Sequence, residues 1–233
     1  MSRPPATESR RRGPTLGAVE LVICDCDGTL ADSLFAITET FRLALAEVGW
    51  RAPVERAAVA RYVGLPLARL FEELLPGAEA ATRARLESAY RRRYPEVAAG
   101  RTPLFPGVRE ALGRLAARGL RLALATGKSR AGVDRFLAES GLAFEAIRCA
   151  DTAAHPKPHP AMVEEILEET GVAPARALMV GDTPYDLEMA HAAGVASCGV
   201  ASGGFTREEL AACGPALLLD RFAQLPEALG GAG

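Results

Sequence analysis

The sequence predicts a doubly wound α/β fold, in which helices cover a parallel β-sheet, with an additional helical domain inserted near the start. Three observations support this prediction. Apolar runs alternate with helical patterns, polar residues gather where the apolar runs end, and the first two runs lie too far apart for a single crossover. The chain has 233 residues, of which 49% are hydrophobic and 24% charged, a composition typical of a globular protein.

The expected strands are short apolar runs that resemble one another. The first, at residues 19–27, is a largely apolar run that ends in acids, which is typical of a parallel strand buried on both faces. Further runs of this kind lie at 120–126, 146–150, 175–182, 196–202 and 216–220. Helical patterns separate them at 107–118, 129–140, 159–170 and 184–193.

The first crossover is too long. Asp27 and Thr126 are 99 residues apart, whereas a βαβ unit needs roughly 30 residues, so roughly 65 are surplus. The surplus has apolar spacing near that of a helix, at 35–48, 55–62, 67–75 and 79–97. We therefore predict a core domain of residues 18–33 and 103–233, with a helical cap domain of residues 34–102 above the carboxyl end of the first strand. Residues 1–17, rich in Pro, Arg and Ser, are expected to form a disordered tail.

Two acids end the first strand. Asp25 and Asp27, in DCDGTL, are two positions apart and point to the same side of an extended chain. Such carboxylates serve as nucleophile and acid/base, or they hold a divalent cation. Gly28 permits a turn after them, and Thr29 adds a hydroxyl. A polar turn without chemistry is the alternative for this motif taken alone.

Other strands also end in polar groups. Thr126 and Gly127, in ATGKS, open a helix whose amides suit a phosphate, although a simple helix cap is the alternative. Lys157, one of only two lysines, lies between two prolines that restrict it, and a solvated surface lysine is the alternative. Asp182 and Asp186, in GDTPYD, bring two more acids, with helix capping as the alternative. Because these groups lie at or near the carboxyl ends of parallel strands, we expect them to share one crevice.

The ordered set Asp-x-Asp-Gly-Thr, Thr-Gly, Lys-Pro and Gly-Asp-Thr-x-x-Asp resembles the four motifs of the haloacid dehalogenase (HAD) superfamily. Within it, the helical insertion is similar to the C1 cap of subfamily IA, the phosphoglycolate phosphatase group. The resemblance implies a Rossmann-like HAD core and a phosphoric monoester hydrolase.

The resemblance also implies a role for each motif residue. Asp25 would attack phosphorus, and Asp27 would protonate the leaving oxygen and then activate water. Mg²⁺ would be held by the Asp25 carboxylate, by Asp182 and by the main-chain carbonyl of Asp27. Asp186 would orient the metal shell. The groups expected to bind the phosphoryl oxygens are Thr126, the Gly127 amide and Lys157.

Two rival functions stay open. A phosphosugar mutase such as β-phosphoglucomutase shares the core, but it often uses cap lysines and this cap has none. The other rival is a catalytically inactive binding module. We expect a small phosphomonoester such as 2-phosphoglycolate as substrate, selected by the cap loop around Gly64. Arg61 and Arg69 flank that loop and are candidate partners for a substrate carboxylate, with an exposed surface role as the alternative for each.

Composition limits the partners and the location. The formal charge of −2 gives no general attraction to nucleic acid, and no apolar run is long enough for a membrane span. No signal-peptide pattern opens the chain, so we expect a cytoplasmic protein with five reduced cysteines that take no part in catalysis. Neither the physiological substrate nor the oligomeric state follows from the sequence.

Overall fold

The computed structural model describes residues 19–51 and 53–230, so the expected tail at 1–17 lies outside the described residues. It contains one six-stranded parallel sheet in the order β3-β2-β1-β4-β5-β6. The strands are β1 (Leu21–Cys24), β2 (Arg121–Ala125), β3 (Ala146–Arg148), β4 (Ala177–Gly181), β5 (Ala196–Val200) and β6 (Leu217–Leu219). The order reverses between β1 and β4, which is where a doubly wound sheet opens a crevice for its ligand. The predicted fold class is confirmed.

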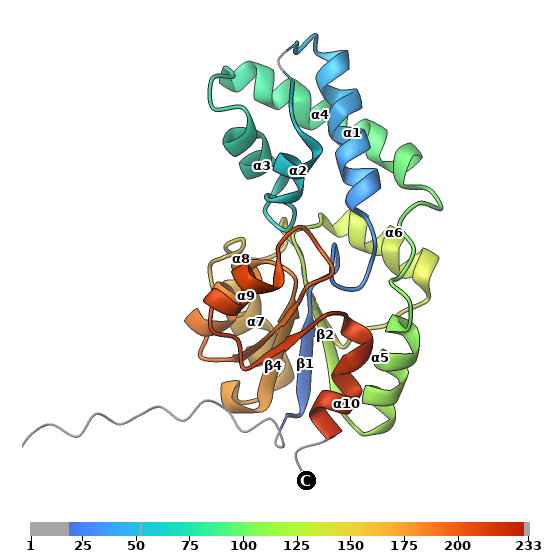
Figure 1. The fold of residues 1–233 in the computed structure, drawn as a ribbon, viewed down its shortest axis with the longest axis vertical. Helices are drawn as coiled ribbons and strands as arrows, with labels where there is room; N and C mark the ends of the chain where they lie inside the picture. The colour runs from blue at the N-terminus through green and yellow to red at the C-terminus, as the bar shows by residue number, and fades with distance from the viewer. Residues whose placement is uncertain (1–18, 52, 231–233) are drawn as a thin grey trace, which may run out of the picture.

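Helices cover both faces of the sheet (Figure 1). In β1, Val22 and Cys24 pack on the face covered by α5 (Val108–Ala117), α6 (Arg130–Ser140) and α10 (Leu225–Gly230). Leu21 and Ile23 pack on the opposite face, against α7 (Ala161–Thr170) and α8 (Pro184–Ala192). Burial on both faces explains why the strand is apolar at every position. No described helix is long and apolar enough to cross a membrane.

Two short helices were not predicted from the sequence. They are α9 (Arg207–Ala212) and α10, of six residues each. Six residues make fewer than two helical turns, so no apolar repeat develops along them.

The helical insert consists of α1 (Leu34–Glu47), α2 (Arg56–Ala60), α3 (Leu67–Leu74) and α4 (Ala80–Ala98), and it lies beyond one end of the sheet (Figure 1). Its helices close around their own apolar core. Phe41 of α1 stacks on Phe71 of α3 with ring centroids 5.1 Å apart, and Tyr90 of α4 meets Phe71 edge-on at 6.3 Å. The insert therefore forms a hydrophobic core from its own helices, without using the sheet.

The two connections between the insert and the sheet run side by side. Ala31 and Leu104 form an antiparallel bridge. The amide of Asp32 donates to the carbonyl of Pro103, and the amide of Phe105 donates to that of Leu30, both at 2.9 Å. This pairing supports our proposed domain boundaries at residues 34 and 102.

Candidate active site

Asp25 follows β1 directly and is completely buried. Its amide donates to the carbonyl of Val180 on the neighbouring strand β4 at 2.9 Å, which fixes the backbone at the reversal of strand order. The Oδ1 atom accepts a hydrogen bond from Lys157 Nζ at 2.7 Å, whereas Oδ2 is buried with no hydrogen-bond partner among the described residues. A buried oxygen without a partner is costly in a folded protein, so this atom is suited to a bound group.

Asp182 and Asp186 complete a cluster of three buried carboxylates with Asp25. Asp182 follows β4 and Asp186 lies in the first turn of α8. One oxygen from each of the three lies within 4.8 Å of the others. Asp182 Oδ1 accepts from the hydroxyl of Thr29 at 2.7 Å. A Cβ atom on Gly28 would clash with the Asp182 carboxylate, and Gly28 also has a φ of +87°, so the turn after Asp27 requires glycine.

Both oxygens of Asp186 already have partners. Oδ1 accepts from Lys157 Nζ at 2.6 Å. Oδ2 accepts from the Thr183 hydroxyl at 2.7 Å and from the Thr183 amide at 3.1 Å, within a helix-capping box. Asp186 is thus a better orienting group than a direct metal ligand.

The buried carboxylates carry more negative charge than Lys157 can balance. Burial, together with the nearby Asp186 charge, raises the pKa of Asp25 to about 7, against the opposing effect of Lys157. Burial and the charges of Asp25 and Asp186 also raise the pKa of Asp182. For Lys157, burial lowers the pKa, but Asp186 and Asp25 outweigh it and the net shift is upward. A divalent cation held by the Asp25 and Asp182 carboxylates would restore the charge balance, so the residues present fit the metal that the resemblance implies.

Asp27 has different partners from the three clustered carboxylates. Its Oδ1 accepts a hydrogen bond from the hydroxyl of Ser33 and forms an ion pair with Lys128 Nζ at 2.6 Å. Lys128 also donates to the hydroxyl of Tyr94 on α4, at 3.2 Å. Lys128 therefore links Asp27, the second acid of the first motif, to the helical insert.

Lys128 is a site residue that was not predicted from the sequence. Its position, two residues after Thr126 and just beyond the end of β2, is the sequence feature that could have placed it in the site. The Lys128 side chain is only 9% exposed. Burial lowers its pKa, but the charge of Asp27 outweighs this and the net shift is upward, so Lys128 is charged beside Asp27.

Thr126 and Gly127 lie where the sequence predicts, directly after β2 and beside β1. Thr126 is buried, and its hydroxyl accepts from the Lys128 amide at 3.2 Å. A Cβ on Gly127 would clash with the carbonyl of Gly64, because the loop between α2 and α3 lies directly against it. The insert therefore contacts the second motif through Gly64.

Arg61 and Arg69 are both exposed and paired with acidic side chains, which agrees with the surface role considered for each. Arg61 pairs with Glu209 at 2.6 Å and stacks over the ring of Phe205, 4.2 Å from its centroid. Arg69 pairs with Glu72 and Glu73 of its own helix. Arg61 connects the insert to the core, and Arg69 is an exposed helix charge.

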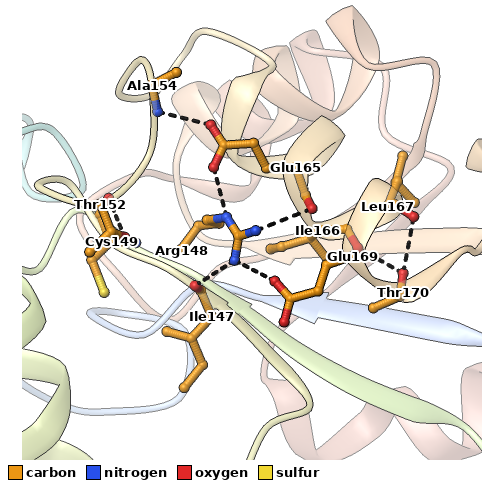
Figure 2. A network of polar contacts seen from close by, with 10 residues as sticks. All are labelled: Ile147, Arg148, Cys149, Thr152, Ala154, Glu165, Ile166, Leu167, Glu169 and Thr170. Carbon is orange, nitrogen blue, oxygen red and sulfur yellow. Dashed lines mark hydrogen bonds and ion pairs between the residues drawn. The ribbon is translucent and has the colours of Figure 1, made fainter.

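The loop that carries Lys157 is tied to the core by Arg148, at the end of β3 (Figure 2). Arg148 donates to Glu165 and Glu169 of α7, each at 2.7 Å. The second oxygen of Glu165 accepts from the Ala154 amide at 2.8 Å. These contacts hold the end of β3 and the middle of the loop against α7, which limits where Lys157 can lie.

All five cysteines are free thiols. Cys24 and Cys26 flank Asp25 and are completely buried, and burial raises the pKa of each. A buried thiol with a raised pKa is a poor nucleophile, so Cys24 and Cys26 are not suited to nucleophilic catalysis despite their position beside Asp25.

Comparisons with known proteins agree with these motifs. A family model described as "Haloacid dehalogenase-like hydrolase" matches residues 22–200. A phosphoglycolate phosphatase of Rhodospirillum rubrum is 40% identical over 220 residues, which cover 90% of each chain. "Probable phosphatase IndB" of Dickeya dadantii is 37% identical over 212 residues, 88% of this chain and 91% of its own.

A solved structure is similar over the same length. The "predicted phosphoglycolate phosphatase" of Haemophilus somnus has a TM-score of 0.80 at 25% identity, covering 93% of this chain and 99% of that one. The resemblance inferred from the four motifs is thereby confirmed. With the family model spanning most of the chain and relatives above 30% identity along nearly all of it, this protein belongs to the haloacid dehalogenase-like hydrolase family.

Proposed function

We propose that the protein is a Mg²⁺-dependent phosphatase that hydrolyses a small phosphomonoester through a phosphorylated Asp25. The main support is Asp25 itself, which is buried, held at one oxygen by Lys157 and without a partner at the other. Family membership and the phosphatase names of its relatives support a phosphoric monoester hydrolase.

In the first half of the proposed reaction, Asp25 Oδ2 forms a bond to phosphorus as the bond from phosphorus to the ester oxygen breaks. Asp27 gives a proton to that oxygen, which leaves as an alcohol. In the second half, water attacks phosphorus, its proton passes to Asp27, and the bond to Asp25 breaks. Inorganic phosphate leaves and both carboxyl groups return to their starting states.

A carboxylate approaches an anionic phosphate unfavourably unless positive charge offsets the repulsion. We assign this task to Lys157, with the Thr126 hydroxyl and the Gly127 amide as further donors to the phosphoryl oxygens. Mg²⁺ bound by Asp25, Asp182 and the Asp27 carbonyl would supply the remaining positive charge. Asp186 would position both Lys157 and the metal shell.

The proposed substrate is a small phosphomonoester of the phosphoglycolate type. The insert covers the approach to Gly127 with the loop around Gly64, which favours short substrates over polymers. A cytoplasmic location is part of this proposal and agrees with five free thiols.

Phosphate release from p-nitrophenyl phosphate and 2-phosphoglycolate, with Mg²⁺ or with EDTA, tests the proposal. We expect Mg²⁺-dependent release that falls by several orders of magnitude in Asp25→Asn, a change that keeps the side-chain volume but removes the nucleophile. Release unaffected by EDTA or by Asp25→Asn would contradict it. No release from any phosphomonoester would favour the inactive binding module.

A further inference from the structure

A cavity of about 340 Å³ lies between the insert and the core, beside the proposed acid/base. Asp27 reaches it, together with Lys128 and Arg135 from the core and Gly64 and Tyr90 from the insert. The volume is in the usual range for small-molecule sites. Because Asp27 is the proposed proton donor to the leaving oxygen, the organic part of the substrate would occupy this cavity.

The charged residues that line the cavity differ in how they are paired. Arg91 is bound to Glu87, and Lys128 to Asp27, each at 2.6 Å. Asp151 accepts the Arg130 amide at the start of α6 at 2.8 Å.

Arg135 differs from these charged residues in having no such partner within the described ranges. Its guanidinium makes no hydrogen bond or ion pair with any residue in the described ranges, although its side chain is half-buried at the cavity wall.

We propose that Arg135 binds a carboxylate on the organic part of the substrate. The substrates would then be phosphomonoesters of short carbon chains that carry this second anionic group, with 2-phosphoglycolate the smallest. This inference rests on the proposed function, since it places the leaving group beside Asp27.

The chemistry of the cavity suits this pairing. A guanidinium matches a carboxylate with two parallel hydrogen bonds, which a lysine ammonium does not. Leu65, Leu67 and Leu70 line the same cavity with Tyr90, and their apolar surface lowers the local dielectric. An ion pair formed there is stronger than one on an exposed surface.

The test compares two esters with the same two-carbon chain, 2-phosphoglycolate and ethyl phosphate, in wild type and Arg135→Met. We expect the substitution to lower kcat/KM for 2-phosphoglycolate about 10- to 100-fold, the usual range for losing a hydrogen bond to a charged group. Ethyl phosphate and p-nitrophenyl phosphate should change by less than about twofold, as they lack the carboxylate. Because each ester is compared with itself across variants, their different leaving groups do not affect the result.

Arg130→Met is the matched control. It removes an arginine from the same helix, but this one is exposed and paired with Asp134. We expect no change in the ratio of kcat/KM between the two esters. Arg135→Lys, which keeps the charge and loses the bidentate geometry, should give an intermediate ratio and replaces Arg135→Met if that variant does not fold.

An equal loss for both esters, or an unchanged value for 2-phosphoglycolate, would overturn the assignment of Arg135. A wild-type protein that hydrolyses ethyl phosphate and p-nitrophenyl phosphate but not 2-phosphoglycolate would do so as well. Failure of the proposed function looks different, because wild type would then release phosphate from none of the three esters in the presence of Mg²⁺.

Discussion

Lys157 donates a hydrogen bond to Asp25 across 2.7 Å, and both side chains are buried. The same ammonium donates to Asp186 at 2.6 Å, so one cation serves two buried carboxylates. Removal of that cation leaves two uncompensated buried charges, a more costly change than the loss of a surface ion pair.

Replacement of Lys157 by Met should therefore affect stability and activity together. We expect a loss of about 3 to 5 kcal/mol in the free energy of unfolding, and a fall in kcat of at least about 100-fold from the missing phosphoryl donor. Urea unfolding and phosphate release measure the two effects. Arg176→Met, which breaks the exposed pair with Glu20, is the control and should cost no more than about 1 kcal/mol. A Lys157→Met protein as stable as this control would contradict the buried-pair argument.

Asp27→Asn should affect esters according to their leaving groups. Asn keeps the size of the side chain but cannot donate the proton that an alkoxide needs. We expect a fall in kcat of about 100- to 10,000-fold with ethyl phosphate, and a much smaller fall in the burst of p-nitrophenol, a good leaving group. Stopped-flow measurement of that burst separates the first half-reaction from the second. Equal losses of first-step rate with both esters would argue against proton donation by Asp27.

Stability without metal should decrease as the pH rises. Asp25 has a folded-state pKa raised from 3.8 to about 7, so the folded state retains this proton at pH values where the unfolded chain has lost it. The contribution of Asp25 to stability is therefore complete below pH 3.8 and is lost as the pH rises through 7. In EDTA, the Tm should be lower at pH 8 than at pH 5.

Added Mg²⁺ should reverse this trend, because it binds the ionised carboxylates. At a hundredfold excess over its Kd, we expect Mg²⁺ to raise the Tm at pH 8 by about 5 to 10 °C, and by less at pH 5. Asp182→Asn removes one proposed ligand and should reduce the shift at pH 8. Equal Mg²⁺ shifts at both pH values in wild type would show that these carboxylates do not hold the metal.

Gly127→Ala should displace the insert from the core, because the added methyl group would overlap the Gly64 carbonyl. We expect kcat/KM for 2-phosphoglycolate to fall by about 100-fold, as a displacement near 1 Å can cause, and hydrogen exchange in residues 61–67 to become faster. Gly132→Ala is the control, since the nearest atom to its new Cβ is 3.5 Å away. Unchanged exchange at 61–67 in Gly127→Ala would mean that the loop does not rest on Gly127.

The sequence by itself determined the alternation of strands and helices, the helical insert and the placement of chemical groups at strand ends. Each of these is a local pattern: the apolar run before Asp25, the glycine turn after Asp27 and the helix start at Asp186 are visible within a few residues. Because parallel strands share one carboxyl edge, Asp25, Thr126 and Asp182 could be assigned to one crevice before any coordinates were known.

Only the tertiary structure decided which side chains meet. Lys157 is 132 residues from Asp25 in the chain, and the contact of Lys128 with Asp27 and Tyr94 depends on how the insert packs over the sheet. Likewise, the sequence left open whether Arg61 and Arg69 meet a substrate carboxylate or lie exposed on the surface. In the structure both are exposed and paired with glutamates, and Arg135 is unpaired within the described residues. Hydrogen bonds and ion pairs act over a few ångströms, so which distant residues come within that range depends on the packing of the insert against the core, and no short sequence pattern records it.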